Sequence, residues 1–229
     1  MGHSVFENCT GLSSVILSNQ IDKIDYRTFY NCNNLESIII PESITKIGTA
    51  CFDKCDKLTS VTFHCKEIGG SWFSSNNDIK TVVIGDEVTI INDFVFQECI
   101  NLTNVTIGKN IETIKYGAFY GCRNLQNVYC YAEEIPSMYS EVFSRSNISD
   151  AILHVPVTSI ESYKSTSPWS EFGNIKPLTE EETDICQLNV NTPLNDSKNV
   201  WYTLDGKKLD GKPQKSGIYI RNQQKIIIQ

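Results

Sequence analysis

The 229-residue sequence contains no apolar run of about eighteen residues, the length at which a helix can cross a lipid bilayer. It also has no cluster of Lys and Arg: 27 acidic residues outnumber 20 basic ones, and the net charge is -7. Because binding to phosphates needs concentrated positive charge, we expect neither membrane insertion nor a nucleic-acid partner. Met1 to Ser4 offer no basic or apolar region of a signal peptide.

A repeat of about 23 residues occupies the first two thirds of the chain. Alignment on phenylalanine gives spacings of 23, 23, 21, 23, 23 and 24 residues. A unit this short cannot bury its own apolar face, so consecutive units must stack and share a core. The sequence therefore predicts a solenoid of seven coils, numbered here 1 to 7, whose marker residues are Phe6, Phe29, Phe52, Phe73, Phe96, Phe119 and Phe143.

Each unit also carries the alternating pattern of a short strand. In coil 5, for example, Leu102, Val105 and Ile107 are apolar and the residues between them are polar. Because successive strand side chains point to opposite faces, we expect the apolar residues to point inward and their neighbours to form an outer face of a parallel sheet.

The segment Ile111 to Tyr131, IETIKYGAFYGCRNLQNVYCY, resembles the BspA-like class of leucine-rich repeats, whose units read I-x-x-I, A-F-x-x-C and L-x-x-V-x-I. The resemblance covers Ser4 to Pro156 and implies a right-handed, β-rich solenoid. It further implies a cell-surface or secreted protein that binds host extracellular proteins or other cells. Coils 4 and 7 depart from the pattern: coil 4 is two residues short and has Asn76 in place of cysteine, and coil 7 has Ser146 there and lacks one residue before Ile148. We expect both to be less regular.

Two columns of the repeat are candidates for the core. The bulky aromatic and the small thiol recur at fixed places in each coil, so we expect both to be buried, with the thiols acting as small apolar residues. Parallel side-chain directions make disulfide geometry poor between stacked cysteines. This structural ladder comprises Phe29, Phe52, Phe96 and Phe119 with Cys32, Cys55, Cys99 and Cys122.

The chain divides into four parts. Residues 1–156 are the solenoid, with coil 1 cut short, so we expect a fragment of a longer protein. Residues 157–176 should form a short amphipathic helix that covers the end of the solenoid, with Thr158 and Glu161 at the spacing of a capping box. Residues 177–198 are polar and acidic and predict a linker. Residues 199–229 predict a small β module.

That module, with YTLDGKKL followed by SGIYIRNQQKIII, resembles the C-terminal sorting-type domain of exported proteins from Bacteroidetes-like bacteria. The resemblance implies export to the cell surface or the medium.

Candidates for chemistry are sparse. A polysaccharide-acting enzyme is one alternative, because another solenoid class, the parallel β-helix, hosts such enzymes, but their sites need converging acids and bases. Glu36 and Lys80 fall two coils apart, about 10 Å by strand spacing, and His64 and His154 fall on one column four coils apart, about 20 Å. We therefore expect no catalytic residues, no metal and no cofactor.

What remains is a candidate binding face on the outer side of the sheet. Tyr129 and Tyr131 project from one strand, and tyrosine combines a large contact area with a polar group, which suits protein and sugar contacts alike. We predict a non-catalytic module that binds an extracellular protein or glycan. Two alternatives stay open: the tyrosines only shield the sheet, or the solenoid is a spacer for another domain. The oligomeric state stays open. The face comprises Tyr129, Tyr131, Ile152, His154, Thr106 and His64, and the columns place Ile152 beside Tyr129 and His154 beside Tyr131.

Overall fold

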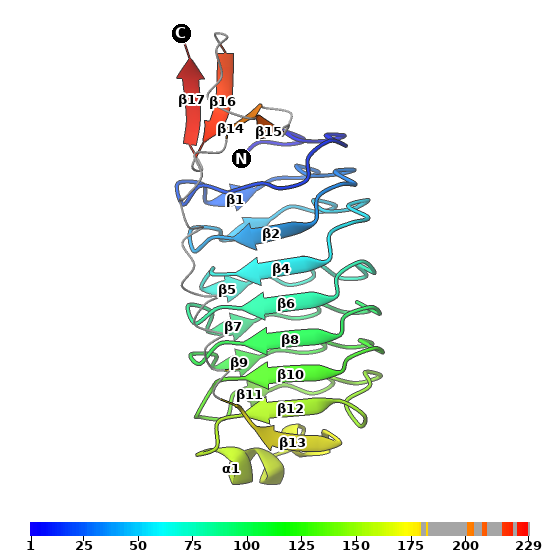
Figure 1. Cartoon of the computed structure of the whole chain (residues 1–229). Helices are drawn as coiled ribbons and strands as arrows, with labels where there is room; N and C mark the ends of the chain where they lie inside the picture. Colours follow the sequence, from blue (N-terminus) through cyan, green and yellow to red (C-terminus); the bar gives the residue numbers. More distant parts are fainter. Residues whose placement is uncertain (180–181, 183–200, 204–207, 210–216, 222–223, 229) are drawn as a thin grey trace.

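The computed structural model describes residues 1–179 and 182, together with the backbone of 201–203, 208–209, 217–221 and 224–228. Residues 1–177 form a stack of coils, each contributing one layer (Figure 1). Within these described ranges, no helix is long and apolar enough to span a membrane.

One wall of the stack is a seven-stranded parallel sheet, which confirms the predicted solenoid. The first six of its strands alternate between a side chain that is buried inside the stack and one that is wholly or partly exposed, except that residues 81–84 and 152–155 each bury a third residue. The last strand, residues 174–177, has no fully buried residue. From the N-terminal end the strands are β2 (Ser37–Ile40), β4 (Ser60–Phe63), β6 (Thr81–Ile84), β8 (Asn104–Ile107), β10 (Asn127–Cys130), β12 (Ile152–Val155) and β13 (Asn174–Pro177).

The opposite wall consists of two-residue strands in two separate sheets. β1 (Lys23–Ile24) pairs with β3 (Lys46–Ile47), and a second sheet joins the four strands that follow, but β3 does not pair with β5. Only residues 64–66 connect β4 to β5, whereas residues 41–45 and 85–89 make the equivalent connections of the neighbouring coils. The shorter path explains the break. The second sheet holds β5 (Glu67–Ile68), β7 (Ile90–Ile91), β9 (Thr113–Ile114) and β11 (Ser137–Met138).

The phenylalanines stack through the interior as one column. Successive rings from Phe6 to Phe143 lie 5.0–6.3 Å apart between centroids and are nearly parallel. Phe29, Phe96 and Phe119 have no exposed surface and Phe52 is 4% exposed. Their burial confirms the predicted alignment of the repeat.

The cysteine column is buried too, but its thiols act as donors and not only as small apolar groups. The Cys55 Sγ donates to the Phe29 carbonyl oxygen at 3.1 Å, and each of the other three thiols makes the same contact with the phenylalanine of an earlier coil. In coil 7 the Ser146 hydroxyl donates to Phe119 O in the same way, so serine substitutes for cysteine. The other three contacts are Cys32 to Phe6, Cys99 to Phe73 and Cys122 to Phe96.

A pair of left-handed residues flanks each phenylalanine, two positions before it and two after. Their φ angles are positive and between 52° and 74°. In coils 1, 2, 4 and 5 the amides of these residues and of the phenylalanine point toward the next coil and donate to its carbonyls, as Arg27, Phe29 and Asn31 do to Thr49, Cys51 and Asp53. The pairs are Ser4 and Asn8, Arg27 and Asn31, Ala50 and Lys54, Ser71 and Ser75, Phe94 and Glu98, Gly117 and Gly121, and Glu141 and Arg145.

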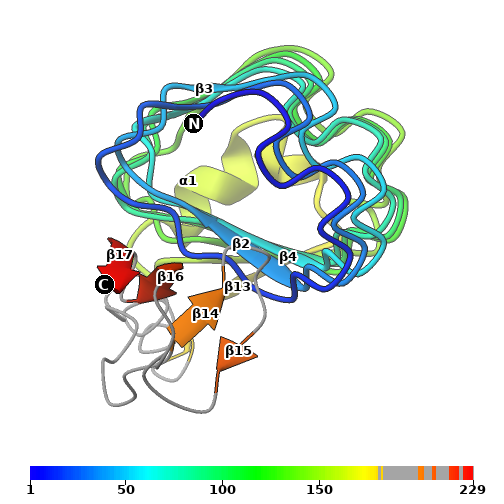
Figure 2. The same cartoon turned by 90° about the horizontal axis from the view of Figure 1, so that it is seen from above.

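A short helix covers the C-terminal end of the stack. α1 (Ile160–Ser165) lies across the interior, seen from above in Figure 2, and is followed by a 3-10 turn, η1 (Trp169–Glu171). Tyr163 is fully buried and donates to Ala132 O at 2.9 Å. The predicted capping box was wrong: the N-cap is Ser159, which makes no side-chain cap bond and instead donates to Glu133 O at 2.6 Å.

Four strands of the predicted C-terminal module form an antiparallel sheet in the order β15-β14-β16-β17. The D-G-K turn, Asp205 to Lys207, and most of the predicted linker, residues 183–198, lie outside the described residues. The four strands are β14 (Trp201–Thr203), β15 (Lys208–Leu209), β16 (Gly217–Arg221) and β17 (Gln224–Ile228).

Candidate functional site

The outer face of the seven-stranded sheet presents one central column of side chains. The strand register places Thr106 next to Tyr129 and Tyr129 next to His154, on three consecutive strands. Tyr129 and Thr106 are half-buried, and His154 is 9% exposed. The complete column is Ile39, Thr62, Val83, Thr106, Tyr129, His154 and Lys176.

This register corrects the predicted position of two residues. We expected His154 beside Tyr131 and Ile152 beside Tyr129, but His154 pairs with Tyr129 and Ile152 pairs with Asn127. β12 begins nine residues after Phe143, whereas β10 begins eight after Phe119, so coil 7 gains a residue where we expected a loss. The added residue is accommodated in a turn that ends with the fully buried Ala151, whose amide donates to Ile148 O.

Tyr129 and His154 form a stacked pair. Their ring centroids are 4.4 Å apart and their planes differ by 26°. The Glu182 carboxylate lies 3.2 Å from His154 Nδ1. Burial lowers the pKa of His154 more than the Glu182 carboxylate raises it, so the imidazole is neutral at neutral pH.

The same glutamate also contacts the second tyrosine. The Tyr131 hydroxyl donates a hydrogen bond to the backbone oxygen of Glu182, 51 residues further along the chain. Burial, followed by the charge of Glu182, raises the pKa of Tyr129. Tyr129, Tyr131, His154 and Glu182 therefore make one cluster, called the tyrosine–histidine cluster below.

The other predicted face residues lie outside this cluster. Ile152 is half-buried in a neighbouring column. His64 directly follows β4, three coils from Tyr131, and its Nδ1 lies 3.1 Å from Glu87 Oε2. Sequence reasoning missed Glu182 entirely, because a contact over 51 residues leaves no signal in the repeat.

The cluster does not have the geometry of a catalytic centre. His154 has a carboxylate beside Nδ1, but within the described residues its Nε2 has no hydrogen-bond partner that could serve as a nucleophile. Over the same residues, no three His, Cys, Asp or Glu side chains come together in a way that could hold a metal ion. The arrangement is a rigid aromatic and imidazole surface suited to contact.

Comparison with known proteins agrees with the coil geometry. The sequence pattern of the BspA type leucine rich repeat region matches residues 1–99 and 66–167 of the chain, in six copies. The chain belongs to this family. No curated protein matches the BspA-type chain.

Solved structures of leucine-rich repeat proteins are similar to the chain, and the first of them shares its fold. One from Bacteroides ovatus is 21% identical with a TM-score of 0.53, and the match covers 74% of this BspA-type chain and 43% of that protein. A leucine rich cell surface protein from Faecalibacterium prausnitzii is 19% identical with a TM-score of 0.37, over 74% of this chain and 55% of that one. The T. pallidum leucine-rich repeat protein is 26% identical with a TM-score of 0.40, over 51% and 69% respectively. The chain thus spans less than half the length of the B. ovatus protein.

Proposed function

We propose that this chain is a non-catalytic interaction module of an exported bacterial protein and binds an extracellular protein or glycan through the outer face of its seven-stranded sheet. Membership of the BspA-type family supports an interaction role. The name of the F. prausnitzii protein places that protein at the cell surface. The antiparallel C-terminal sheet is compatible with a sorting-type module.

The observation that carries the proposal is the stacking of Tyr129 on His154 on the outer sheet face. A side chain that is already ordered loses little entropy when a partner binds, and tyrosine is enriched among residues that contribute most to binding. Contacts of Glu182 with His154 and Tyr131 hold the cluster in one arrangement. A preorganised aromatic surface with hydroxyl and carboxylate groups at its edge suits both protein and glycan contacts.

The test is a binding screen of the purified chain against extracellular-matrix proteins and immobilised glycans. The Tyr129→Ala, Tyr131→Ala double variant should lose saturable binding at an unchanged melting temperature. Tyr139→Ala is the matched control, because Tyr139 is 57% exposed and does not belong to the seven-stranded sheet. If Tyr139→Ala lost as much binding as the double variant, the binding could not be assigned to the tyrosine–histidine cluster.

A spacer role is the second candidate. It is favoured by the uninterrupted column of phenylalanine rings from Phe6 to Phe143, which makes the stack stiff along its axis. The Tyr131→Phe variant helps to distinguish a spacer from a binding module, because it removes the hydroxyl contact with Glu182 but keeps the aromatic ring. Failure of the wild-type chain to bind any member of the screen would favour the spacer.

A further inference from the structure

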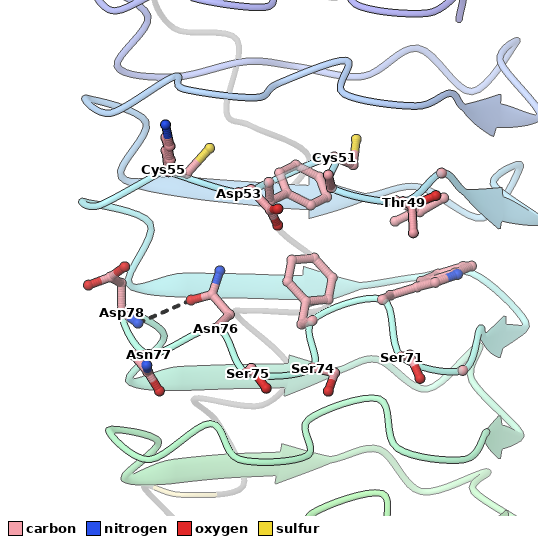
Figure 3. Close-up of a pocket in the computed structure, with 18 residues that line it drawn as sticks. Thr49, Cys51, Asp53, Cys55, Ser71, Ser74, Ser75, Asn76, Asn77 and Asp78 are labelled. Carbon is pink, nitrogen blue, oxygen red and sulfur yellow. Dashed lines mark hydrogen bonds between the residues drawn. The ribbon is translucent and has the colours of Figure 1, made fainter.

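A cleft of about 650 Å³ opens between coils 3 and 4, where coil 4 is two residues short. Its walls are residues Ile47–Cys55 of coil 3 and Gly70–Asp78 of coil 4 (Figure 3). None of these residues belongs to the seven-stranded sheet, so this inter-coil cleft is separate from the tyrosine–histidine cluster. Its volume falls within the range of about 300–1,000 Å³ that is typical of small-ligand sites.

The backbone groups that join the other coils are unpaired in the cleft. At the junction of coils 2 and 3, three amides donate to three carbonyls of the next coil, and the same three bonds recur between coils 4 and 5 and between coils 5 and 6. Within the described part of the chain, the equivalent amides of Ala50, Phe52 and Lys54 have no acceptor. Among the same described residues, the equivalent carbonyls of Gly70, Trp72 and Ser74 have no donor.

The short β4–β5 connection is the cause of this opening. Strand β5 pairs with β7 and not with β3, so coil 4 stays bonded to coil 5 on this side. Gly70 lies so close to coil 5 that an added Cβ would come within 2.9 Å of Asp93 O. The Phe52 and Phe73 rings nevertheless remain in contact at 5.0 Å. The cleft is therefore a wedge that is closed at the phenylalanine column and open to solvent.

Polar side chains add to both walls. The Asp53 carboxylate points from coil 3 into the gap, and the Asn76 amide points into it from coil 4 (Figure 3). Asn76 Oδ1 accepts from the amides of Asp78 and Ile79, which fixes the orientation of its NH2 group. Trp72 contributes an aromatic surface to the lining. Each wall thus offers both donors and acceptors.

We propose that the inter-coil cleft binds a neutral carbohydrate, one or a few sugar rings in size. A sugar hydroxyl both donates and accepts, so it can satisfy the amides of coil 3 and the carbonyls of coil 4 at once, and an indole suits a sugar ring face. An anion would meet three carbonyls and the carboxylates of Asp53 and Asp78, and a cation would meet three amides. An extended peptide that hydrogen-bonds to both walls would have to lie about 4.8 Å from each of them. The walls meet at the floor of the wedge, so they are too close together there for a peptide strand.

The first experiment titrates the full chain with neutral mono-, di- and trisaccharides of glucose, galactose, mannose and N-acetylglucosamine by calorimetry. We expect saturable binding of at least one saccharide. Asp53→Ala removes an acceptor from the cleft, and Asp53→Tyr fills it; each should weaken that binding at least tenfold.

The chain provides a matched control for both changes. Gln97 holds the position of Asp53 at the closed junction of coils 5 and 6, directly after its phenylalanine, and Tyr30 and Tyr120 show that tyrosine is accepted there. Gln97→Ala and Gln97→Tyr should therefore leave saccharide binding unchanged. Equal loss in the Asp53 and Gln97 variants would overturn the assignment to the cleft.

Hydrogen exchange gives a second readout that does not require any variant to fold. Without sugar, the amides of Ala50, Phe52 and Lys54 should exchange faster than the paired amides of Arg27, Phe29 and Asn31. A saturating saccharide should slow the first group and leave the second unchanged. No binding by any saccharide, or slowing only by an extended peptide, overturns the proposal. The Tyr129→Ala, Tyr131→Ala variant should bind saccharide normally. The proposal for the inter-coil cleft and the proposal for the tyrosine–histidine cluster can therefore be refuted separately.

Discussion

The thiol of Cys122 donates a hydrogen bond to the carbonyl oxygen of Phe96 in the preceding coil, at a distance of 3.2 Å. The contact explains why serine replaces cysteine in coil 7, where the Ser146 hydroxyl donates to Phe119 O. An apolar side chain of similar size could fill the space but could not donate. From coil 2 to coil 7 the column is therefore filled by small donors, except in coil 4, where Asn76 stands.

Substitutions at Cys122 test the need for a donor. Cys122→Ser keeps a donor, whereas Cys122→Val removes it, so Val should destabilise the fold by about 1 kcal/mol more than Ser, the usual net worth of a hydrogen bond. Urea unfolding curves measure the difference. A valine variant as stable as the wild type would show that the thiols contribute only by packing.

The phenylalanine column should dominate stability. Phe119 is fully buried between Phe96 and Phe143, so Phe119→Ala should cost about 3 to 5 kcal/mol in denaturant unfolding. The control is Phe94→Ala, because Phe94 is partly exposed and contacts the Tyr116 ring at the edge of the coil. A cost below about 1 kcal/mol for Phe119→Ala would contradict the packing of the column.

The buried thiols should be unreactive in the folded protein. Burial raises the pKa of Cys51, Cys55 and Cys99 to about 12, so at pH 8 almost none is thiolate. We expect a thiol reagent to modify them only after unfolding, and mass spectrometry to find no disulfide among the eight described cysteines. Between pH 9 and 12 the folded protein keeps thiol protons that the unfolded chain loses. The stability that these thiols contribute is therefore complete below pH 9 and is lost as the pH rises toward 12. Rapid labelling at pH 8 without unfolding would refute the burial.

His154 should make stability depend on pH in the opposite direction. Its pKa in the folded protein lies below the usual 6.5 because it is buried, so the unfolded chain binds a proton that the folded chain does not. The free energy of unfolding should therefore be complete above pH 6.5 and fall as the pH drops through that value toward the lowered pKa. Urea midpoints between pH 5 and 8 measure this, and His154→Gln should have a shallower slope. If the urea midpoints of the wild type and of His154→Gln changed equally with pH, His154 would not be the source of the pH dependence.

The two glycines of coil 6 should differ in their tolerance of alanine. Both have left-handed φ, which costs an alanine about 1–2 kcal/mol. An added Cβ at Gly117 would also lie 2.8 Å from the Phe94 ring, whereas at Gly121 it meets the movable end of Glu98. We expect Gly117→Ala to lower the melting temperature more than Gly121→Ala does. The reverse order would show that ring crowding is unimportant.

The repeat made most of the fold predictable. The phenylalanines and cysteines recur at a fixed spacing, and coils of this length must stack to bury them. Three features were out of reach. The left-handed pairs include residues as different as Ser4, Arg27 and Phe94, so no pattern of glycines in the sequence predicts them. The register of β12 depends on how one turn accommodates Ala151. The contact of Glu182 with Tyr131 joins segments with no repeat relation.

The left-handed pairs give the whole stack a direction. In coils 1, 2, 4, 5 and 6 the corner amides point toward the next coil and the corner carbonyls of that coil point back, so the peptide dipoles add along the axis as they do in a helix. The N-terminal end of this corner is consequently electronegative and the C-terminal end electropositive. The two ends are not interchangeable: a further coil, or a second stack, can continue the bonding pattern only head to tail.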